Sequence, residues 1–232
     1  MKIADKYSMT ESEKNELITV SLSIDAETAF EYQCSTLLVK AQLKAISEGK
    51  IKNTWNEVAI TRHLKKHLRQ IIGEIGVQYF VIPEYPEDDE EIDDGNKSPA
   101  EEVYFDLVFS SFSISKQFYF AVEAKIIIEN NFRKRIATTE ISEYISNKGM
   151  RKFIEGIYKK KGCMLGYVVE GNPAAIVKKI NEKIRIDPFY KESAILEKKP
   201  LIEDFDCYYE STHSEYNNNP LRHLFLDFAT KN

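Results

Sequence analysis

The chain has few of the features that mark several large classes of protein. No apolar run approaches the roughly 20 residues that a membrane-spanning helix needs. The polar N-terminal stretch MKIADKYSMTESEKNE has no signal-peptide core. The cysteines number only three among 232 residues and are widely spaced, which argues against a disulfide framework or a zinc-cysteine cluster. We therefore expect a cytoplasmic protein with no membrane partner.

Length and composition favour a single folded unit. The apolar content of 43% is enough for a sizeable core, and 232 residues suit one large domain. We expect residues 1–232 to form that domain, with a helical N-terminal part over 1–50 and an acidic loop over 84–102. The sequence has no internal repeats and contains no glycine-rich phosphate loop.

Negative charge is concentrated in one segment. Residues 84–102 hold ten acids and one lysine, whereas the whole chain has a net charge of −5. The rest of the chain therefore carries about +4, a mildly basic balance that allows a nucleic-acid partner. The acidic loop has two interpretations: it is either a solvated insertion or a nucleic-acid mimic that screens a binding site.

Helices are predicted where apolar residues recur at spacings of three and four. One helix should follow the N-cap Asp25 and run over 26–47. A second should begin after Asn53 or Thr54 and run to about residue 72, with Gly73 and Gly76 in the turn that follows. A third covers 138–158, where Gly149 favours a break, and a fourth starts at the cap-and-proline pair 172–173.

Strands are predicted from apolar runs that are rich in β-branched and aromatic residues. The expected strands are 17–24, 77–83, 103–109, 117–128, 163–169, 205–210 and 222–228. Strands and helices thus both occur along the chain, and we expect an α/β fold.

Charged residues interrupt two of these apolar strands. Asp106 lies in 103–109, and Glu123 and Lys125 lie in 117–128, where a spacing of two places both on one face. A hairpin with its tip at 114–115 sets Asp106 opposite Glu123, since both are then equally far from the tip. Buried charges are costly unless they are paired or bind a metal, so these three residues are candidates for a functional site.

This pattern resembles the PD-(D/E)xK nuclease family, whose signature is an Asp on one strand and Glu-x-Lys on the next. Here the matching residues are Asp106 and Glu123-Ala124-Lys125. The family often adds a glutamate on an earlier helix, and Glu57 fits that position. The resemblance covers about residues 57–184, and Phe105 stands where the family usually has proline.

The resemblance implies a restriction-endonuclease-like fold, in which helices flank a central mixed sheet. It also implies metal-assisted hydrolysis of phosphodiester bonds, with DNA as the expected substrate. It implies Asp106, Glu123, Lys125 and Glu57 as catalytic residues. Magnesium, with manganese as an alternative, would be bound by Asp106, Glu123, Glu57 and the carbonyl of Ala124. Lys125 would orient or help to deprotonate the attacking water. The setting it implies is bacterial restriction or anti-phage defence, in which partner proteins of a defence complex also bind.

Other interpretations remain open at the level of the sequence. The same residues could belong to a catalytically silent module that binds a partner protein or a nucleic acid. Glu123 and Lys125 could form an ion pair, and Glu57 could only favour the helix dipole. The basic runs 133–135 and 159–161 are either phosphate contacts or plain surface charge. The sequence leaves the oligomeric state open.

Overall fold

The computed structural model describes residues 26–87, 102–112, 117–190, 195–213 and 219–229, together with Ile92, Asp94, Asn96, Ser98 and Tyr216. Four features that the sequence predicts lie outside these residues: strand 17–24, the cap Asp25, most of the acidic loop and the hairpin tip at 114–115. No helix in the described part of the chain is both long and apolar enough to cross a bilayer.

The centre of the fold is a seven-stranded mixed sheet with the order β1-β2-β3-β4-β7-β6-β5. Strand β3 is parallel to β4, β4 is parallel to β7, and the other neighbouring pairs are antiparallel. The strands are β1 (Tyr79–Pro86), β2 (Tyr104–Phe112), β3 (Gln117–Ile128), β4 (Gly162–Glu170), β5 (Glu197–Lys198), β6 (Tyr208–Thr212) and β7 (Pro220–Asp227). The predicted mixed α/β sheet is thus confirmed.

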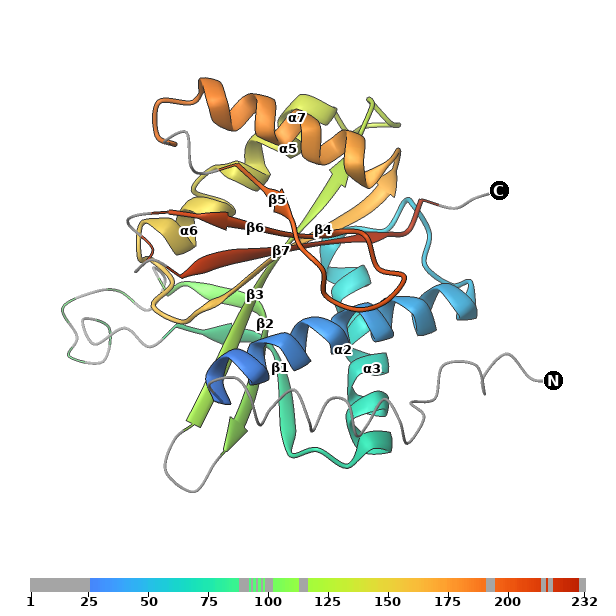
Figure 1. Ribbon diagram of the computed structural model, residues 1–232, viewed down its shortest axis with the longest axis vertical. Coiled ribbons are helices and arrows are strands. Elements are labelled where there is room, and N and C mark those ends of the chain that lie inside the picture. The colour runs from blue at the N-terminus through green and yellow to red at the C-terminus, as the bar shows by residue number, and fades with distance from the viewer. Residues whose placement is uncertain are drawn as a thin grey trace.

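Helices cover both faces of the sheet (Figure 1). One face packs against α2 (Ala26–Glu48) and α3 (Glu57–Ile75), and the other against α5 (Ala137–Ile145), α6 (Met150–Ile154) and α7 (Pro173–Ile186). Each layer encloses its own apolar core, because strand side chains alternate between the two faces. Leu64 and Val122 belong to the first core, and Tyr144 and Phe225 belong to the second.

The hairpin of β2 and β3 has the register that the sequence predicts. Leu107 lies opposite Val122 and Phe112 lies opposite Gln117, so Asp106 and Glu123 are the next residues in line. Strand β3 stays paired with β4 as far as Ile128, whereas its pairing with β2 ends at Leu107 and Val122 within the described residues. The far half of β3 therefore has an edge that β2 does not cover.

Helix α3 begins and ends a few residues later than expected. Its N-cap is Asn56, whose side chain accepts a hydrogen bond from the Ala59 amide at 2.9 Å, so the prediction of Asn53 or Thr54 is wrong. Arg135 explains the shift, because its guanidinium donates to the carbonyl oxygens of Asn53 and Trp55 and keeps that segment outside the helix.

The other end of α3 also corrects the prediction. Gly73 lies inside the helix, and the chain leaves it at Gly76, where φ is 69° and the amide donates to the carbonyl of Ile72. The predicted helix 138–158 is divided into α5 and α6, so the break at Gly149 is confirmed. A Cβ on Gly149 would lie 2.2 Å from the carbonyl oxygen of Tyr144, which leaves no room for a side chain.

Strand boundaries differ from the predictions by a few residues at most. Strand β3 has the predicted bounds, whereas β6 begins three residues later than the expected 205–210. Asn172 caps α7 as predicted and accepts from the amides of Ala174 and Ala175. The short strand β5 had no counterpart in the sequence analysis, because two exposed charged residues carry no strand signal.

Candidate functional site

The site lies where β2 and β3 part. Amides of alternate residues along β3 point toward β2, and beyond Val122 these are the amides of Ala124 and Ile126. Side chains bind both of them in place of a strand. The Asp106 carboxylate accepts from the Ala124 amide at 2.6 Å, and the Glu57 carboxylate from the Ile126 amide at 3.3 Å. Two of the predicted site residues are therefore anchored to the same stretch of β3.

Lys125 joins these carboxylates. Its ammonium nitrogen lies 2.6 Å from Oε1 of Glu123, 2.8 Å from the Ala124 carbonyl oxygen and 3.5 Å from Oε1 of Glu57. Its side chain is only 13% exposed, so the charge is largely withdrawn from water. The structure thus brings together Glu57, Asp106, Glu123, Lys125 and the carbonyl of Ala124, the five groups that the sequence analysis selected.

Two further residues complete the surroundings of Glu123. Lys152 of α6 donates to Oε1 at 3.0 Å, and the hydroxyl of Tyr158 donates to Oε2. Lys152 also donates to the Tyr158 hydroxyl at 2.9 Å, which links the two groups. Neither residue is predicted from the sequence, because contacts across the broken helix leave no trace in the apolar spacing.

Burial and mutual repulsion shift the pKa values in this cluster. Desolvation, followed by the charges of Glu123 and Glu57, raises the pKa of Asp106 to about 7. Desolvation also raises the pKa of Glu57. For Lys125, desolvation acts in the lowering direction but the three carboxylates outweigh it, so its pKa is raised. At neutral pH Lys125 is an ammonium ion, and Asp106 lies close to its midpoint of protonation.

The oxygens of this cluster suit a hard divalent cation. Magnesium prefers oxygen ligands and is held by one or two carboxylates, with water and phosphate completing its shell. Asp106, Glu123 and the Ala124 carbonyl offer that set. Glu57, Asp106 and Glu123 do not all approach within 4.8 Å of one another, since the only such acid or histidine group among the described residues lies elsewhere. At least one of these three carboxylates would therefore have to move before all of them could bind one ion.

That other group consists of Glu48, at the end of α2, with His63 and His67 of α3. The Nε2 atoms of the histidines are 3.3 Å apart, and Oε2 of Glu48 lies 3.6 Å from His63 and 3.7 Å from His67. Burial lowers the pKa of both histidines, against the raising effect of Glu48, which favours neutral imidazoles. This group is not among the sites predicted from the sequence, although histidines four residues apart share a helix face.

The basic runs that the sequence offered as phosphate contacts are partly engaged within the protein. Arg135 binds two backbone carbonyls of the segment before α3. Lys160 forms an ion pair with the buried Glu87 at 2.7 Å, and the amide of Lys159 donates to the same carboxylate. Glu87 thereby ties the start of the acidic loop to the segment after α6.

Comparisons with models of protein families, with curated proteins and with solved structures found no match. A function is therefore inferred from the chemistry of the residues described above.

Proposed function

We propose that the protein is a metal-dependent nuclease that hydrolyses phosphodiester bonds, with DNA as the preferred substrate. The observation that carries this proposal is the convergence of Glu57, Asp106, Glu123 and the Ala124 carbonyl around the ammonium of Lys125. Three acids and a lysine that are largely withdrawn from water are costly to maintain for stability alone. Perturbed groups of this kind are typical of catalytic sites.

The order of the elements supports the resemblance to the PD-(D/E)xK family. Helix α3 carries Glu57 at its first residue, β2 carries Asp106, β3 carries Glu123 and Lys125, and the helix α5 follows. This is the order that the resemblance implies, and it occurs here in a mixed sheet. We accordingly propose a restriction-endonuclease-like fold. With it we propose a role in restriction or anti-phage defence, in a complex with partner proteins.

Each residue has a distinct task in the proposed reaction. Asp106, Glu123 and the Ala124 carbonyl would hold magnesium or manganese, which polarises the phosphate and offsets charge on the leaving oxygen. Lys125, an ammonium ion at neutral pH, orients the attacking water and offsets phosphate charge. Its raised pKa disfavours proton abstraction by Lys125. Glu57 holds the Ile126 amide and contacts Lys125, so it positions the lysine.

A second candidate function has its own supporting observation. Both oxygens of Glu123 already have partners, since Oε1 binds Lys125 and Lys152 and Oε2 binds Tyr158. A carboxylate has about four lone-pair sites, and three are taken without any metal. Such a cluster could be purely structural in a catalytically silent module that binds a protein or a nucleic acid.

Cleavage assays separate the two functions. Purified protein is incubated with single-stranded DNA, double-stranded DNA and RNA, each with magnesium, with manganese and with excess EDTA. We expect divalent-dependent cleavage that Lys125→Ala reduces at least about 100-fold, as expected for losing one transition-state contact. Lys148→Ala is the matched control, because Lys148 is exposed and pairs only with Glu143 among the described residues.

Two outcomes would reject the nuclease. One is the absence of metal-dependent cleavage on every substrate, and the other is cleavage by Lys125→Ala at the wild-type rate. Binding of nucleic acid without cleavage, unaffected by EDTA, would instead favour the silent module.

A further inference from the structure

We infer that Glu48, His63 and His67 form a second metal site, which takes a transition-metal ion of the zinc class and joins the end of α2 to α3. This site is separate from the proposed nuclease centre and does not depend on it. Two imidazoles and one carboxylate form a donor set that zinc uses in proteins, with three protein ligands and one open position. Magnesium, in contrast, prefers oxygen ligands alone.

The distances between the three donor atoms fit a shared ion, although the two Nε2 atoms also lie within hydrogen-bond distance of each other, at 3.3 Å. A separation of 3.6 Å or 3.7 Å between Glu48 and the histidines is too long for a hydrogen bond. A tetrahedral ion with ligand distances of about 2.0–2.1 Å has neighbouring ligands about 3.3–3.4 Å apart, by simple geometry. The His63 to His67 separation is 3.3 Å, and the other two separations are only a few tenths of an ångström longer.

The backbone fixes all three side chains independently of a metal. His63 and His67 are one helical turn apart on α3, so their rings face the same direction. Glu48 is the last residue of α2, and the chain turns away at Gly49, which has a φ of 63°. His67 is fully buried, and its Nδ1 has no hydrogen-bond partner among the described residues. The only engaged atom of this imidazole is therefore Nε2, which faces the other two donors.

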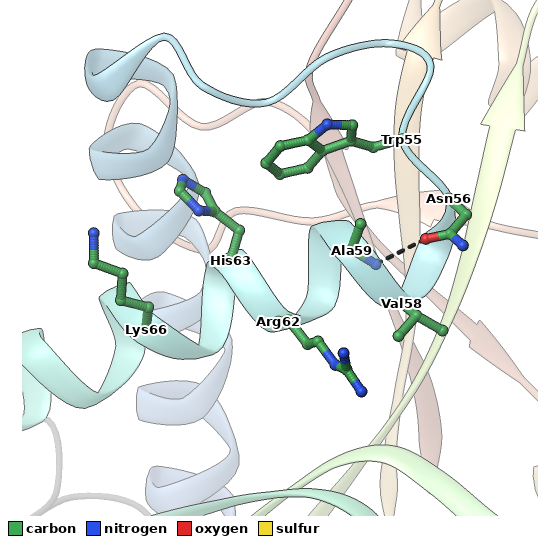
Figure 2. A pocket seen from close by; sticks show the side chains of 7 residues that line it. All are labelled: Trp55, Asn56, Val58, Ala59, Arg62, His63 and Lys66. Carbon is green, nitrogen blue, oxygen red and sulfur yellow. Dashed lines mark hydrogen bonds between the residues drawn. The ribbon is translucent and has the colours of Figure 1, made fainter.

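Solvent can reach the site on one side. His63 lines an open surface pocket together with Trp55, Arg62 and Lys66. Figure 2 shows His63 and Lys66 projecting from the same side of α3, with the Trp55 ring nearby, whereas Arg62 points away from them. A metal ion can therefore enter from the pocket, and a water molecule can complete its shell from the same side.

The charge around Glu48 gives the main competing explanation. Lys50 and Lys66 lie 3.3 Å from its two oxygens, so Glu48 could simply serve as their partner. These lysines are mostly exposed, at 62% and 57%, and exposed ion pairs contribute little to stability. They also do not explain why the fully buried His67, which hydrogen-bonds to His63, has Glu48 as a second neighbour.

An ion at this position would influence the start of α3. It would link Glu48 to His63 across the connection 49–56, which leads directly into Glu57. With the two carbonyl contacts of Arg135, this connection would then be fixed at both ends. The inferred role is therefore to hold, together with Arg135, the connection that leads into α3.

Zinc binding to the metal-free full-length protein tests the inference. Calorimetry should detect one zinc ion per chain, and cobalt should give the visible absorption of a tetrahedral centre. Zinc at 100 times its Kd should raise Tm by about 5–10 °C. His63→Gln and Glu48→Gln should each weaken zinc binding at least about 100-fold, since loss of an outer-shell partner alone costs 10–100-fold. These side chains are partly exposed, so both variants should fold.

The controls separate this site from others that zinc could use. Lys66→Ala keeps all three ligands and should retain wild-type affinity, and so should Asp106→Asn, which alters the proposed nuclease centre. Cys207→Ser tests the thiol that is not fully buried. The inference is wrong if the protein binds no zinc, if His63→Gln binds zinc as tightly as the wild type, or if Cys207→Ser alone abolishes binding.

Discussion

Helix α3 contributes to two polar clusters, of which the first is largely buried and the second opens to solvent at Glu48. At its first residue, Glu57 joins a group of carboxylates that the chain neutralises with its own cation, the ammonium of Lys125. Two to three turns further along, His63 and His67 face Glu48, whose charge is offset only by the exposed Lys50 and Lys66. The first cluster offers oxygen donors and the second mostly nitrogen. Donor type, more than affinity alone, decides which metal a site selects.

The comparison is tested most strongly by Asp106→Asn. Asparagine can still accept from the Ala124 amide, so the fold is preserved, but the negative charge is lost. We expect cleavage to fall about 1,000-fold or more, because the proposed magnesium site loses one of its carboxylates. Melting curves provide the second measurement: magnesium should stop raising Tm in this variant, whereas zinc should still raise it. Loss of both shifts would mean that the two clusters are one functional unit.

The two clusters should respond to pH in opposite directions. The pKa of Asp106 is raised from 3.8 to about 7, so the folded protein binds an additional proton between these values. The stability that this proton contributes is fully present below about pH 4 and is lost as the pH rises through 7. The pKa values of His63 and His67 are lowered, so their contribution is present above pH 6.5 and is lost as the pH falls.

Urea unfolding with EDTA at pH 4 and pH 8 measures this difference. When the pH is raised from 4 to 8, the unfolding free energy of Asp106→Asn should increase relative to that of the wild type. The expected increase is on the order of 3 kcal/mol, at about 1.4 kcal/mol per pKa unit. A parallel pH dependence of the two proteins would show that Asp106 titrates normally.

Tyr158→Phe examines how much the surroundings of Glu123 contribute. The change removes one hydroxyl that donates to Glu123 and accepts from Lys152. We expect magnesium affinity and cleavage to fall about 10–100-fold, as for other residues that orient a ligand. Zinc affinity should not change, because Tyr158 has no contact with the histidines. If cleavage rises instead, the hydroxyl competes with the metal for Glu123.

Asn56→Ala is expected to have the smallest effect and provides a test of helix position. Loss of an N-cap costs about 1 kcal/mol, and here it loosens the residue that precedes Glu57. Asn172→Ala is the matched control, because Asn172 caps α7 in the same way. Both variants should lose similar stability in denaturant, and only Asn56→Ala should also reduce cleavage several-fold. An equal effect on cleavage would assign the loss to general destabilisation.

Much of the fold follows from local patterns, and the misses have physical causes. Strand β3 and the break at Gly149 were predicted because apolar alternation and an interior glycine are local signals. The start of α3 was not predicted correctly, since Asn53, Thr54 and Asn56 are all acceptable caps. The choice among them depends on Arg135, which is about 80 residues away in the chain. A contact over that distance leaves no mark in the local sequence.

The candidate site also contains some residues that local patterns predict and others that depend on distant contacts. Asp106, Glu123 and Lys125 were selected because charges inside apolar strands are conspicuous, and equal distances from the hairpin tip set their register. Lys152 and Tyr158 could not be selected, because they reach Glu123 only through the bend between α5 and α6. The Glu48 cluster combines two helices, and only its histidine spacing is visible in one of them.

The uncovered edge of β3 has a consequence for exchange with solvent. Strand amides normally exchange slowly because a neighbouring strand holds them, but the amides of Ala124 and Ile126 are held by the carboxylates of Asp106 and Glu57. Their protection therefore follows the ionisation and ligation of those two side chains. Deuterium uptake at these two positions reports the state of the candidate site from the backbone itself. The amide of Val122 belongs to the last β2–β3 pair, just before the two strands separate, and provides an internal reference.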